Sequence, residues 1–500
     1  MRHLTPTPQR PVSRRSLFRL TGAAGLGASA VLAAGPTAQA RPRVRPAAPA
    51  GRTYAHPGLL HTRADLDRMA EKVAAGEQPW TAGWEKLISG RYAQADYQAR
   101  ATARVLRGGE GQNAVLLFQD AHAAYQNALR WHIGGDRAHG DTARDILNAW
   151  SGTLRELGGN ADRFLMAGSQ GWQLAAAGEL IRDYGGFELD RFSTMLTDIF
   201  YPMNDHFLRE HNGAVDTNYR NNWDAVNMAS VLAIGAFTED DAMVDQAVDY
   251  FKNGSGNGNI HRAVNFLHED GTLGQWEESG RDQEHTMGGL GAMAVVCEMA
   301  WNLGEDLYGY DDNRFMKGAE YVARYNLGHD VPYTEYSRQM GQDGRWYTES
   351  ALGAGGRGNT RPIWALIHNH YAFRRGLDVP NITAYKDKIA PEDGGGHRGP
   401  NSGGFDHLGF GTLTSTQDPA DAPAAPAESA TPAPGEPSTE AGPEAGGNGA
   451  RPQGGSADLA DTGSDSDTLA WGAGAGIAAL TGGLLLLRRR GRQPAGDQRI

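Results

Sequence analysis

The sequence predicts an all-α domain in residues 51–413, built as an (α/α) toroid, or incomplete barrel, of helix pairs. Apolar residues recur at helical spacing along most of this region, and loops of Gly, Asn and Asp separate the helical runs. Alternation typical of strands is scarce before the glycine-rich residues 394–413. Because stacked helix hairpins close most economically into a ring, we expect a cleft where their loops meet.

The first predicted helix begins after Thr62, a favoured N-cap residue, and carries Leu66, Met69 and Val73 at helical spacing. Cys297, the single cysteine of the chain, lies in a later apolar run and is expected to be a core residue. The helical periodicity recurs in residues 115–133, 141–156, 170–184, 189–209, 223–237, 240–252, 281–304, 312–326 and 361–376.

Residues 1–40 read as an export signal rather than as part of the fold. The twin-arginine sequence SRRSLFR at 13–19 precedes an apolar run at 20–34, and Ala-Gln-Ala at 38–40 offers a cleavage site. This order is typical of bacterial proteins that the Tat translocase exports in the folded state. We therefore expect the Tat translocase to be a partner.

The C-terminal part predicts attachment to the cell surface. Residues 414–458 are rich in Pro, Ala and Gly and are expected to form a disordered stalk. The LADTG sequence at 459–463 resembles a sortase signal of the actinobacterial type, an apolar segment at 469–487 is long enough to span a membrane, and a basic tail follows at 488–500. We expect sortase to anchor the protein to peptidoglycan at the outer face of the cell. The alternative is a plain membrane anchor.

The charge balance limits the partners. The formal net charge of the chain is −12, and the folded region remains acidic when the basic termini are set aside. Such a surface lacks the basic footprint that binding to nucleic acid needs, so we expect no nucleic-acid partner. An acidic substrate would need a local cationic site, because the overall field repels it.

Two stretches match parts of ligand-binding motifs without the context that those motifs need. Residues 353–358 fit G-x-G-x-x-G, but no predicted strand precedes them and Pro362 interrupts the next helix. We expect a mobile loop over the cleft there rather than a nucleotide site. His261 and His268 do not form a compact metal-ligand spacing with carboxylates, and we expect neither a metal nor another cofactor.

The most informative stretch is WEESGRDQEHT at 276–286, which is followed at once by an apolar run. With residues 276–301 on one helix at about 100° per residue, Glu278, Arg281, Asp282 and His285 share a face with the apolar stripe. Buried charge is costly unless it is paired or used, so this cluster indicates a functional cleft. The structural alternative is an internal ion pair between Glu278 and Arg281, with His285 hydrogen-bonded.

Further polar clusters have the same character. The stretch DTNYRNNW at 216–223 opens a predicted helix, where asparagines are also frequent as caps. The dense group His368-Asn369-His370-Tyr371 lies in the predicted helix 361–376, where a lone histidine would by default belong to the core. Tyr333 and Tyr336 supply phenols in a predicted loop.

Six stretches of the folded region together carry a family resemblance. They are HPGLLHTRADLDRM (56–69), DTNYRNNWDAVNMASVLAIGAF (216–237), ESGRDQEHTMGGLG (278–291), AWNLGEDLYGY (300–310), EYVARYNLG (320–328) and FDHLGFGTL (405–413). These stretches resemble the alginate-lyase superfamily of polysaccharide lyases. The resemblance covers nearly the whole folded region and implies the incomplete toroid of chondroitin AC lyase-like and alginate lyase-like enzymes. It also implies β-elimination on a uronate-containing anionic polysaccharide, with alginate as the default substrate.

The resemblance also implies roles for single residues. In this superfamily an Asn or similar group neutralises the uronate carboxylate, and a His or Tyr takes the C5 proton. Asn222 and Arg281 suit the carboxylate. The alginate-lyase version has His directly after this Asn, whereas Trp223 stands here. This departure suggests His285 as the base, with His370 as the alternative.

A Tyr protonates the leaving oxygen in this superfamily, which suits Tyr336 or Tyr333, and we expect Glu278 to orient Arg281 or His285. The expected substrate-binding residues are Asn221, Trp223, Tyr219, Asn369 and Tyr371.

Two other classes of protein remain open from the sequence. A glycoside hydrolase on a similar toroid would need two carboxylates about 5–10 Å apart, for which Glu278 or Asp282 could pair with Asp216 or Asp224. A glycan-binding protein displayed on the wall would bind the polymer without cleaving it.

Overall fold

The computed structural model describes residues 51–396 and 405–418. The predicted export signal, most of the stalk, the LADTG sequence, the apolar segment at 469–487 and the basic tail lie outside these residues. Within the described part, no helix is both long and apolar enough to cross a membrane.

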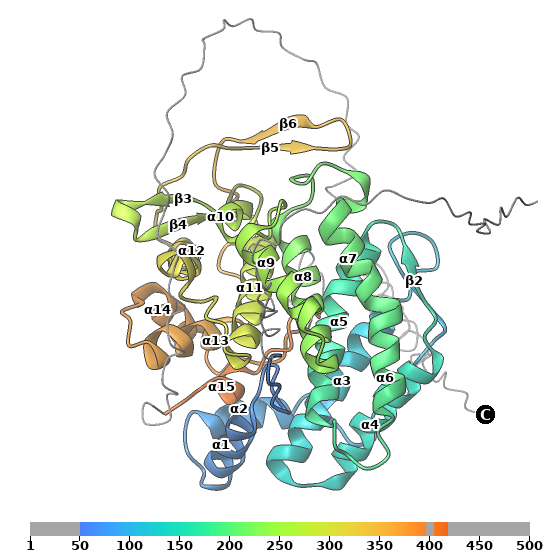
Figure 1. The fold of residues 1–500 in the computed structure, drawn as a ribbon. Helices are drawn as coiled ribbons and strands as arrows, with labels where there is room; N and C mark the ends of the chain where they lie inside the picture. Colours follow the sequence, from blue (N-terminus) through green and yellow to red (C-terminus); the bar gives the residue numbers. More distant parts are fainter. Residues whose placement is uncertain (1–50, 397–404, 419–500) are drawn as a thin grey trace, which may run out of the picture. The chain divides into compact units, whose positions relative to one another are not determined.

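Helices dominate the described residues (Figure 1). Their bounds agree with most of the predicted runs, because helical periodicity is a strong signal in long segments. The helices are α1 (Arg63–Ala74), α2 (Trp80–Ile88), α3 (Val115–Gly134), α4 (Arg137–Thr153), α5 (Asp162–Leu180), α6 (Leu189–Met195), α7 (Tyr201–Glu210), α8 (Asn221–Thr238), α9 (Asp241–Asn253), α10 (Ile260–Ala263), α11 (Gln283–Asn302), α12 (Tyr310–Asn326), α13 (Trp364–His368), α14 (Pro380–Ile389) and α15 (Gly411–Thr414).

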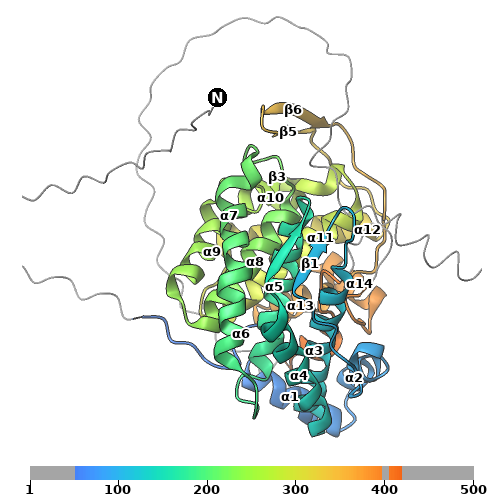
Figure 2. The same cartoon turned by 90° about the vertical axis from the view of Figure 1, so that its right-hand side faces the viewer.

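The central helices form a row in which α3, α5, α8 and α11 pack side by side in that order. They are buried on nearly all sides: every residue of α5 except Arg163 is buried, and so is every residue of α8 except Asn222 and Thr238. Helices α4, α7, α9 and α12 pack against this row, and Figure 2 shows the same arrangement from the side. The predicted mainly helical class is therefore confirmed.

Several local predictions are confirmed. Thr62 caps α1 in a capping box with Asp65, and Cys297 is buried on α11. Two predicted helices contain a wider turn: a π-helical segment, Leu196–Phe200, joins α6 to α7, and another, Asn369–Arg374, continues α13. The predicted helix 170–184 begins earlier, at Asp162, and ends at Leu180.

Three two-stranded sheets were not predicted. The glycine-rich segment 394–413, where the sequence left strands open, is described at 394–396 and 405–413. That segment contributes an isolated bridge between Gly394 and Gly409 and the short α15. Each sheet strand has only four or five residues, too few for a clear alternation. The sheets are β1 (Arg104–Arg107) with β2 (Glu156–Gly159) in parallel, β3 (Val264–His268) with β4 (Leu273–Trp276), and β5 (Tyr336–Met340) with β6 (Arg345–Glu349), the last two antiparallel.

The placement of residues 276–301 on one helix was also wrong. Strand β4 ends at Trp276, a 3-10 turn covers Glu277–Gly280, and α11 begins only at Gln283. Asp282 has extended backbone angles and caps α11 by accepting the His285 N–H at 2.8 Å. An Asp at this position satisfies an otherwise unpaired helix donor, so the helix starts there rather than six residues earlier.

Candidate active site

The two adjacent glutamates of the 3-10 turn cap a neighbouring helix. The backbone N–H of Asn221 donates to Glu277 Oε2 at 3.0 Å, and the N–H of Asn222 donates to Glu278 Oε1 at 3.1 Å. Both carboxyl groups therefore lie at the N-terminus of α8, where free N–H groups and the helix dipole favour negative charge. Asn221 and Asn222 are the first residues of α8 rather than its caps.

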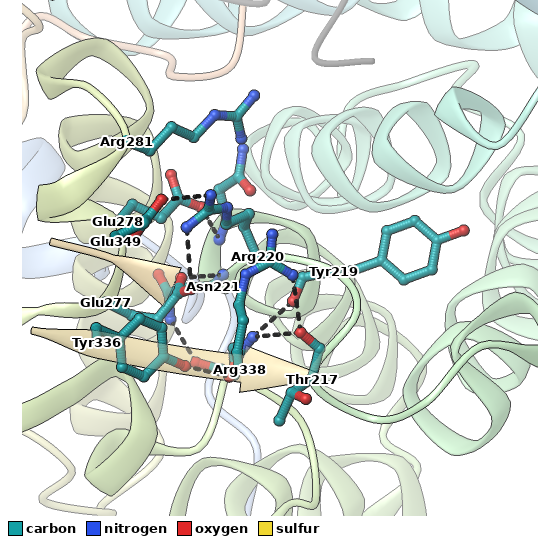
Figure 3. Close-up of polar contacts among 12 residues, drawn as sticks. Thr217, Tyr219, Arg220, Asn221, Glu277, Glu278, Arg281, Tyr336, Arg338 and Glu349 are labelled. Atoms are coloured by element: carbon teal, nitrogen blue, oxygen red, sulfur yellow. Dashed lines mark hydrogen bonds and ion pairs between the residues drawn. The ribbon is translucent and has the colours of Figure 1, made fainter. Parts of the chain in front are cut away.

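A buried cluster of charged groups surrounds this helix start (Figure 3). Arg220 donates to Glu349 at 2.6 Å, and its other terminal nitrogen lies 3.5 Å from Glu277. Arg338 donates to the backbone carbonyls of Thr217, at 3.0 Å, and Asn218. These contacts connect the β5–β6 hairpin, the start of α8 and the turn before α11 into one unit.

Two glycines allow this close approach. A Cβ on Gly289 of α11 would lie 2.4 Å from the Asn221 side-chain oxygen, closer than real Cβ atoms come. A Cβ on Gly280 would lie 2.4 Å from the Tyr333 hydroxyl. The small residues therefore let the starts of α8 and α11 and the tyrosine segment meet in one place.

Glu278 is fully buried at the meeting point of these elements. Burial raises the pKa of its carboxyl to about 7, although the nearby Arg281 charge opposes the shift. Its Oε2 has no hydrogen-bond partner among the described residues. A group this deeply buried cannot reach a glycosidic oxygen, so Glu278 does not suit the role of acid in a glycoside hydrolase.

We expect Glu278→Gln to change how stability depends on pH. The folded-state pKa lies above the ordinary value of 4.5, so the stability that this carboxyl contributes is complete below about pH 4.5 and is lost as the pH rises through about 7. The melting temperature of the Gln variant should therefore decline less than that of the parent chain over this window. The exposed Glu188→Gln serves as the control, and equal declines in all three proteins would contradict the assignment.

Arg281 offers the free cationic group of the site. Its side chain is 11 % exposed, and its Nε lies 3.5 Å from Asp282 Oδ2. The carboxylate nearest to Arg281 is therefore that of Asp282, and the suggested ion pair between Glu278 and Arg281 does not form. Among the residues that the structure describes, neither of its terminal nitrogens forms a hydrogen bond. A largely buried guanidinium with two open donors is suited to bind a carboxylate from a ligand.

His285 is held by Asp282 rather than by Glu278, which corrects the expected partner. The His285 Nδ1 and Asp282 Oδ2 atoms are 2.6 Å apart. Burial lowers the pKa of His285, and the hydrogen bond to Asp282 opposes this lowering. Burial alone would raise the pKa of Asp282, but its bonds with His285 prevail and lower it to about 2. The ring is therefore neutral near pH 7, with Nδ1–H donated to Asp282 and Nε2 left as a base.

Both candidate acids lie half-buried beside the charged cluster. The Tyr336 hydroxyl lies 3.4 Å from the Asn257 side-chain oxygen, and the Tyr333 hydroxyl donates to the Glu349 carbonyl at 3.1 Å. Burial raises the pKa of Tyr336 far above its usual value, and burial and the Glu349 charge raise that of Tyr333 to about 12. Both phenols therefore carry their proton at neutral pH.

Residues 353–358 pack on the start of α11. The Gly355 carbonyl accepts the Gln283 N–H at 2.7 Å, and the Gly353 carbonyl accepts the Gln283 side-chain amide at 2.9 Å. Arg357 stacks on Tyr325, with its guanidinium carbon 3.9 Å from the ring centroid. This segment therefore packs against the α11 N-terminus and supports it.

Asn222 is the one candidate on α8 that remains accessible. Its side chain is half-buried, and its amide forms no hydrogen bond with any described residue. Trp223 and Tyr219 are instead in the core, where both pack on Phe207. Asn221 is fully buried and donates to the Asn257 carbonyl at 2.9 Å. Contact with a substrate was therefore the wrong expectation for Tyr219, Asn221 and Trp223.

The structure does not bring His370 to this site. Its ring stacks on Tyr308 at a centroid distance of 3.8 Å and meets Trp301 edge-on at 4.9 Å. Trp301 lies near the far end of α11, about 24 Å from His285 at about 1.5 Å per residue. Asn369 and Tyr371 are buried beside His370, so this dense cluster is part of the core and not of the candidate site.

Sequence reasoning missed four residues that hold the site: Arg220, Asn257, Arg338 and Glu349. Arg220 lies inside a quoted motif, and a buried arginine next to a helix start could have been considered. The pairing of Asp282 with His285 could also have been found, because Asp is a favoured N-cap residue and its side chain then faces the residue three positions later. Within residues 51–396 and 405–418, no group of three or more His, Cys, Asp or Glu side chains could hold a metal ion.

A helical domain that presents an open guanidinium beside a neutral, carboxylate-oriented histidine fits the class of polysaccharide lyases. The family model described as alginate lyase matches residues 61–331, more than half of the chain, and the chain belongs to the alginate lyase family. It is thus a polysaccharide lyase.

Solved structures of alginate lyases are similar to this chain at low sequence identity. Alginate lyase A1-III from Sphingomonas species A1 is 13 % identical, with 71 % of this chain and 95 % of that chain covered and a TM-score of 0.47. An alginate lyase from Bacteroides ovatus is 14 % identical, with 67 % and 96 % covered and a TM-score of 0.49. No curated protein matches the chain in a comparison of sequences.

Proposed function

We propose that this lyase cleaves a uronate-containing anionic polysaccharide by β-elimination, with alginate as the first candidate substrate. The observation that carries the proposal is the guanidinium of Arg281, whose two terminal nitrogens are open next to His285. The net charge of the chain is negative, so an acidic polymer needs a local cationic group to bind, and the Arg281 guanidinium is such a group.

The residues present can be assigned to each step of the reaction. Arg281 and the free amide of Asn222 bind the uronate carboxylate and stabilise the charge that develops when C5 loses its proton. His285 Nε2 accepts that proton. The electron pair of the C5–H bond forms the C4=C5 double bond, and the C4–O bond breaks. Tyr336, or Tyr333 in its place, gives its proton to the leaving oxygen.

The test of this function is a panel of polymers: alginate, polymannuronate, polyguluronate, glucuronan, hyaluronan and a heparin-like chain. Each is incubated with the purified domain, and the ultraviolet absorbance of unsaturated uronate ends is followed. We expect this absorbance to rise with at least one polymer. New reducing ends without it would indicate hydrolysis, and binding without new ends would indicate a glycan-binding protein.

We expect Arg281→Ala to lower kcat by about 10²–10³-fold, since it removes a group that stabilises charge in the transition state. Arg281→Lys keeps the charge but loses the bidentate hydrogen bonding of the guanidinium, so it should retain only part of the parent rate. The control is Arg324→Ala, which removes an exposed ion pair with Glu269. Steady-state kinetics on the best polymer measure the effect, and an Arg281→Ala enzyme with the parent rate would contradict the role.

We further propose that the row of α3, α5, α8 and α11 is the inner wall of an incomplete (α/α) toroid. The order of their packing and the burial of α5 and α8 on nearly all sides support this arrangement. An experimental structure in which this row curves around a central opening would agree with it, and a flat layer would not.

The location of the enzyme is also a proposal and rests on the sequence alone. We propose export through the Tat translocase, followed by sortase cleavage between Thr462 and Gly463, which would leave the enzyme on peptidoglycan at the outer face of the cell. Residues 414–418 belong to the described domain, where the Thr416 carbonyl accepts from Arg68 and Trp80, so the predicted start of the stalk at 414 was too early. The remaining residues 419–458 would act as a spacer with a span of roughly 30–40 Å. Mass spectrometry of wall digests should find peptides that end at Thr462. Surface protein that retains its tail through Ile500 would indicate a membrane anchor.

A further inference from the structure

The β5–β6 hairpin places one of its faces on the candidate site. Side chains alternate along a strand, so Tyr336, Arg338 and, opposite them, Glu349 and Tyr347 share one face. Figure 1 shows the hairpin at one end of the described domain. Arg338 bonds to the backbone at Thr217, and Glu349 accepts from Arg220 at 2.6 Å, so this face is fixed to the segment before α8.

Tyr347 is much more exposed than the anchored residues beside it on this face. Its exposed fraction is 43 %, whereas Arg338 and Glu349 beside it are 3 % and 6 % exposed. The guanidinium carbons of Arg338 and Arg220 lie 5.7 and 6.0 Å from the centroid of its ring. Two anchored guanidinium groups therefore lie close to the ring, while much of the ring remains exposed to solvent.

The position of this open ring suits a polymer that passes the catalytic residues. Tyr347 pairs with Arg338 and Tyr336 pairs with Glu349, so the two tyrosines are diagonal neighbours on the same face. Such neighbours are about 7–8 Å apart, which is within the reach of one long ligand. A flat ring that is fixed in advance can bind the C–H face of a sugar without a further loss of side-chain freedom.

We propose that Tyr347 is the stacking platform of a subsite for a uronate pyranose ring next to the linkage that is cleaved. The proposal rests on the proposed function, since it takes Tyr336 to lie at the cleaved bond. The aromatic ring binds the apolar face of the sugar, and the guanidinium groups of Arg220 and Arg338, which are themselves anchored, hold the ring in position. Tyr347 takes no part in proton transfer and acts on binding alone.

The adjacent residue supplies a matched control. Trp346 is 70 % exposed and points to the opposite face of the hairpin, where its partner in the register is Gln339. If the polymer bound non-specifically to any exposed aromatic ring, Trp346 would contribute at least as much to binding as Tyr347. A subsite on the face that holds Tyr336 would make Tyr347 important and Trp346 irrelevant.

The kinetic test compares Tyr347→Ala, Tyr347→Phe and Trp346→Ala on the best polymer of the panel. We expect Tyr347→Ala to raise KM about 3–10-fold with kcat within about twofold, in line with the usual worth of an aromatic contact. Tyr347→Phe keeps the ring and should resemble the parent enzyme, as should Trp346→Ala. An unchanged KM in Tyr347→Ala, or an equal rise of KM in Trp346→Ala, would contradict the proposal that Tyr347 is a stacking platform.

A binding measurement separates this proposal from the proposed reaction. Calorimetry with a mannuronate tetrasaccharide and the His285→Ala variant does not depend on turnover. Adding Tyr347→Ala to that variant should weaken binding by the same 3–10-fold factor. If the tetrasaccharide binds and Tyr347→Ala weakens it while the parent enzyme cleaves nothing, the platform stands and the reaction fails. Binding that Tyr347→Ala leaves unchanged, or no binding of a tetrasaccharide from any polymer of the panel, would contradict the proposal that Tyr347 is a stacking platform.

Discussion

Replacing His285 with alanine should lower kcat by about 10²–10⁴-fold, which is the usual contribution of a positioned general base. The imidazole is the one group of the candidate site that combines a neutral charge near pH 7 with a free ring nitrogen. Imidazole added to the solution should restore part of the activity of this variant, because the space of the missing ring is then open to a small base. Steady-state kinetics with and without imidazole measure both effects.

The pH dependence of activity tests the role of His285 as the base independently. Only the neutral ring accepts a proton, so activity should fall as the pH drops through the pKa of His285. Burial lowers that pKa below its ordinary value of 6.5, so the acid limb of kcat/KM should lie below pH 6.5. Full activity in His285→Ala, together with a large loss in a correctly folded His370→Ala, would instead assign the base to His370, in the π-helical segment that continues α13.

Tyr336→Phe should lower kcat by a comparable factor, about 10²–10⁴-fold, because the leaving oxygen then departs without its proton. The hydroxyl of Tyr336 has only a long contact of 3.4 Å to Asn257, whereas that of Tyr333 already donates to the Glu349 carbonyl at 3.1 Å. Tyr336 is therefore the freer donor. The same kinetic assay compares the two phenylalanine variants.

Tyr333→Phe is the matched comparison for this prediction. It should reduce activity less, through a small displacement of the strand that holds Glu349. If Tyr333→Phe abolishes activity while Tyr336→Phe retains it, the acid is Tyr333 and the hairpin only positions the substrate. Equal melting temperatures of the two variants would exclude loss of folding as the cause.

The helices could be predicted from the sequence because their apolar residues repeat along long segments. The turn between Trp276 and Gln283 could not, since its residues fit a helical repeat and only the capping by Asp282 ends that repeat. A periodic pattern is local, whereas β4 is set by its pairing with β3. Predicted faces that cross such a turn are therefore unreliable, and Glu278 and His285 belong to different elements.

The candidate site residues show the same limit of sequence patterns, which report only on residues that are close along the chain. His285 and Arg281 were predicted because charge next to an apolar run is unusual. Arg220 and Glu349 are 129 residues apart, and no local pattern indicates that they meet. The His368–Tyr371 cluster shows the opposite error. Its polar residues are close together in the sequence, as in many functional sites, but aromatic neighbours bury them in the core.

The central claim is that Arg281 and Asn222 hold a uronate carboxylate while His285 faces C5 of the same sugar. A crystal structure of the His285→Ala variant with a bound mannuronate tetrasaccharide tests this directly. The account predicts one carboxylate within hydrogen-bond distance of the Arg281 guanidinium and the Asn222 amide, with C5 of that ring toward the space that His285 vacates and Tyr336 near the glycosidic oxygen. A tetrasaccharide whose carboxylates all lie away from Arg281, or whose C5 faces Tyr336 alone, would contradict it.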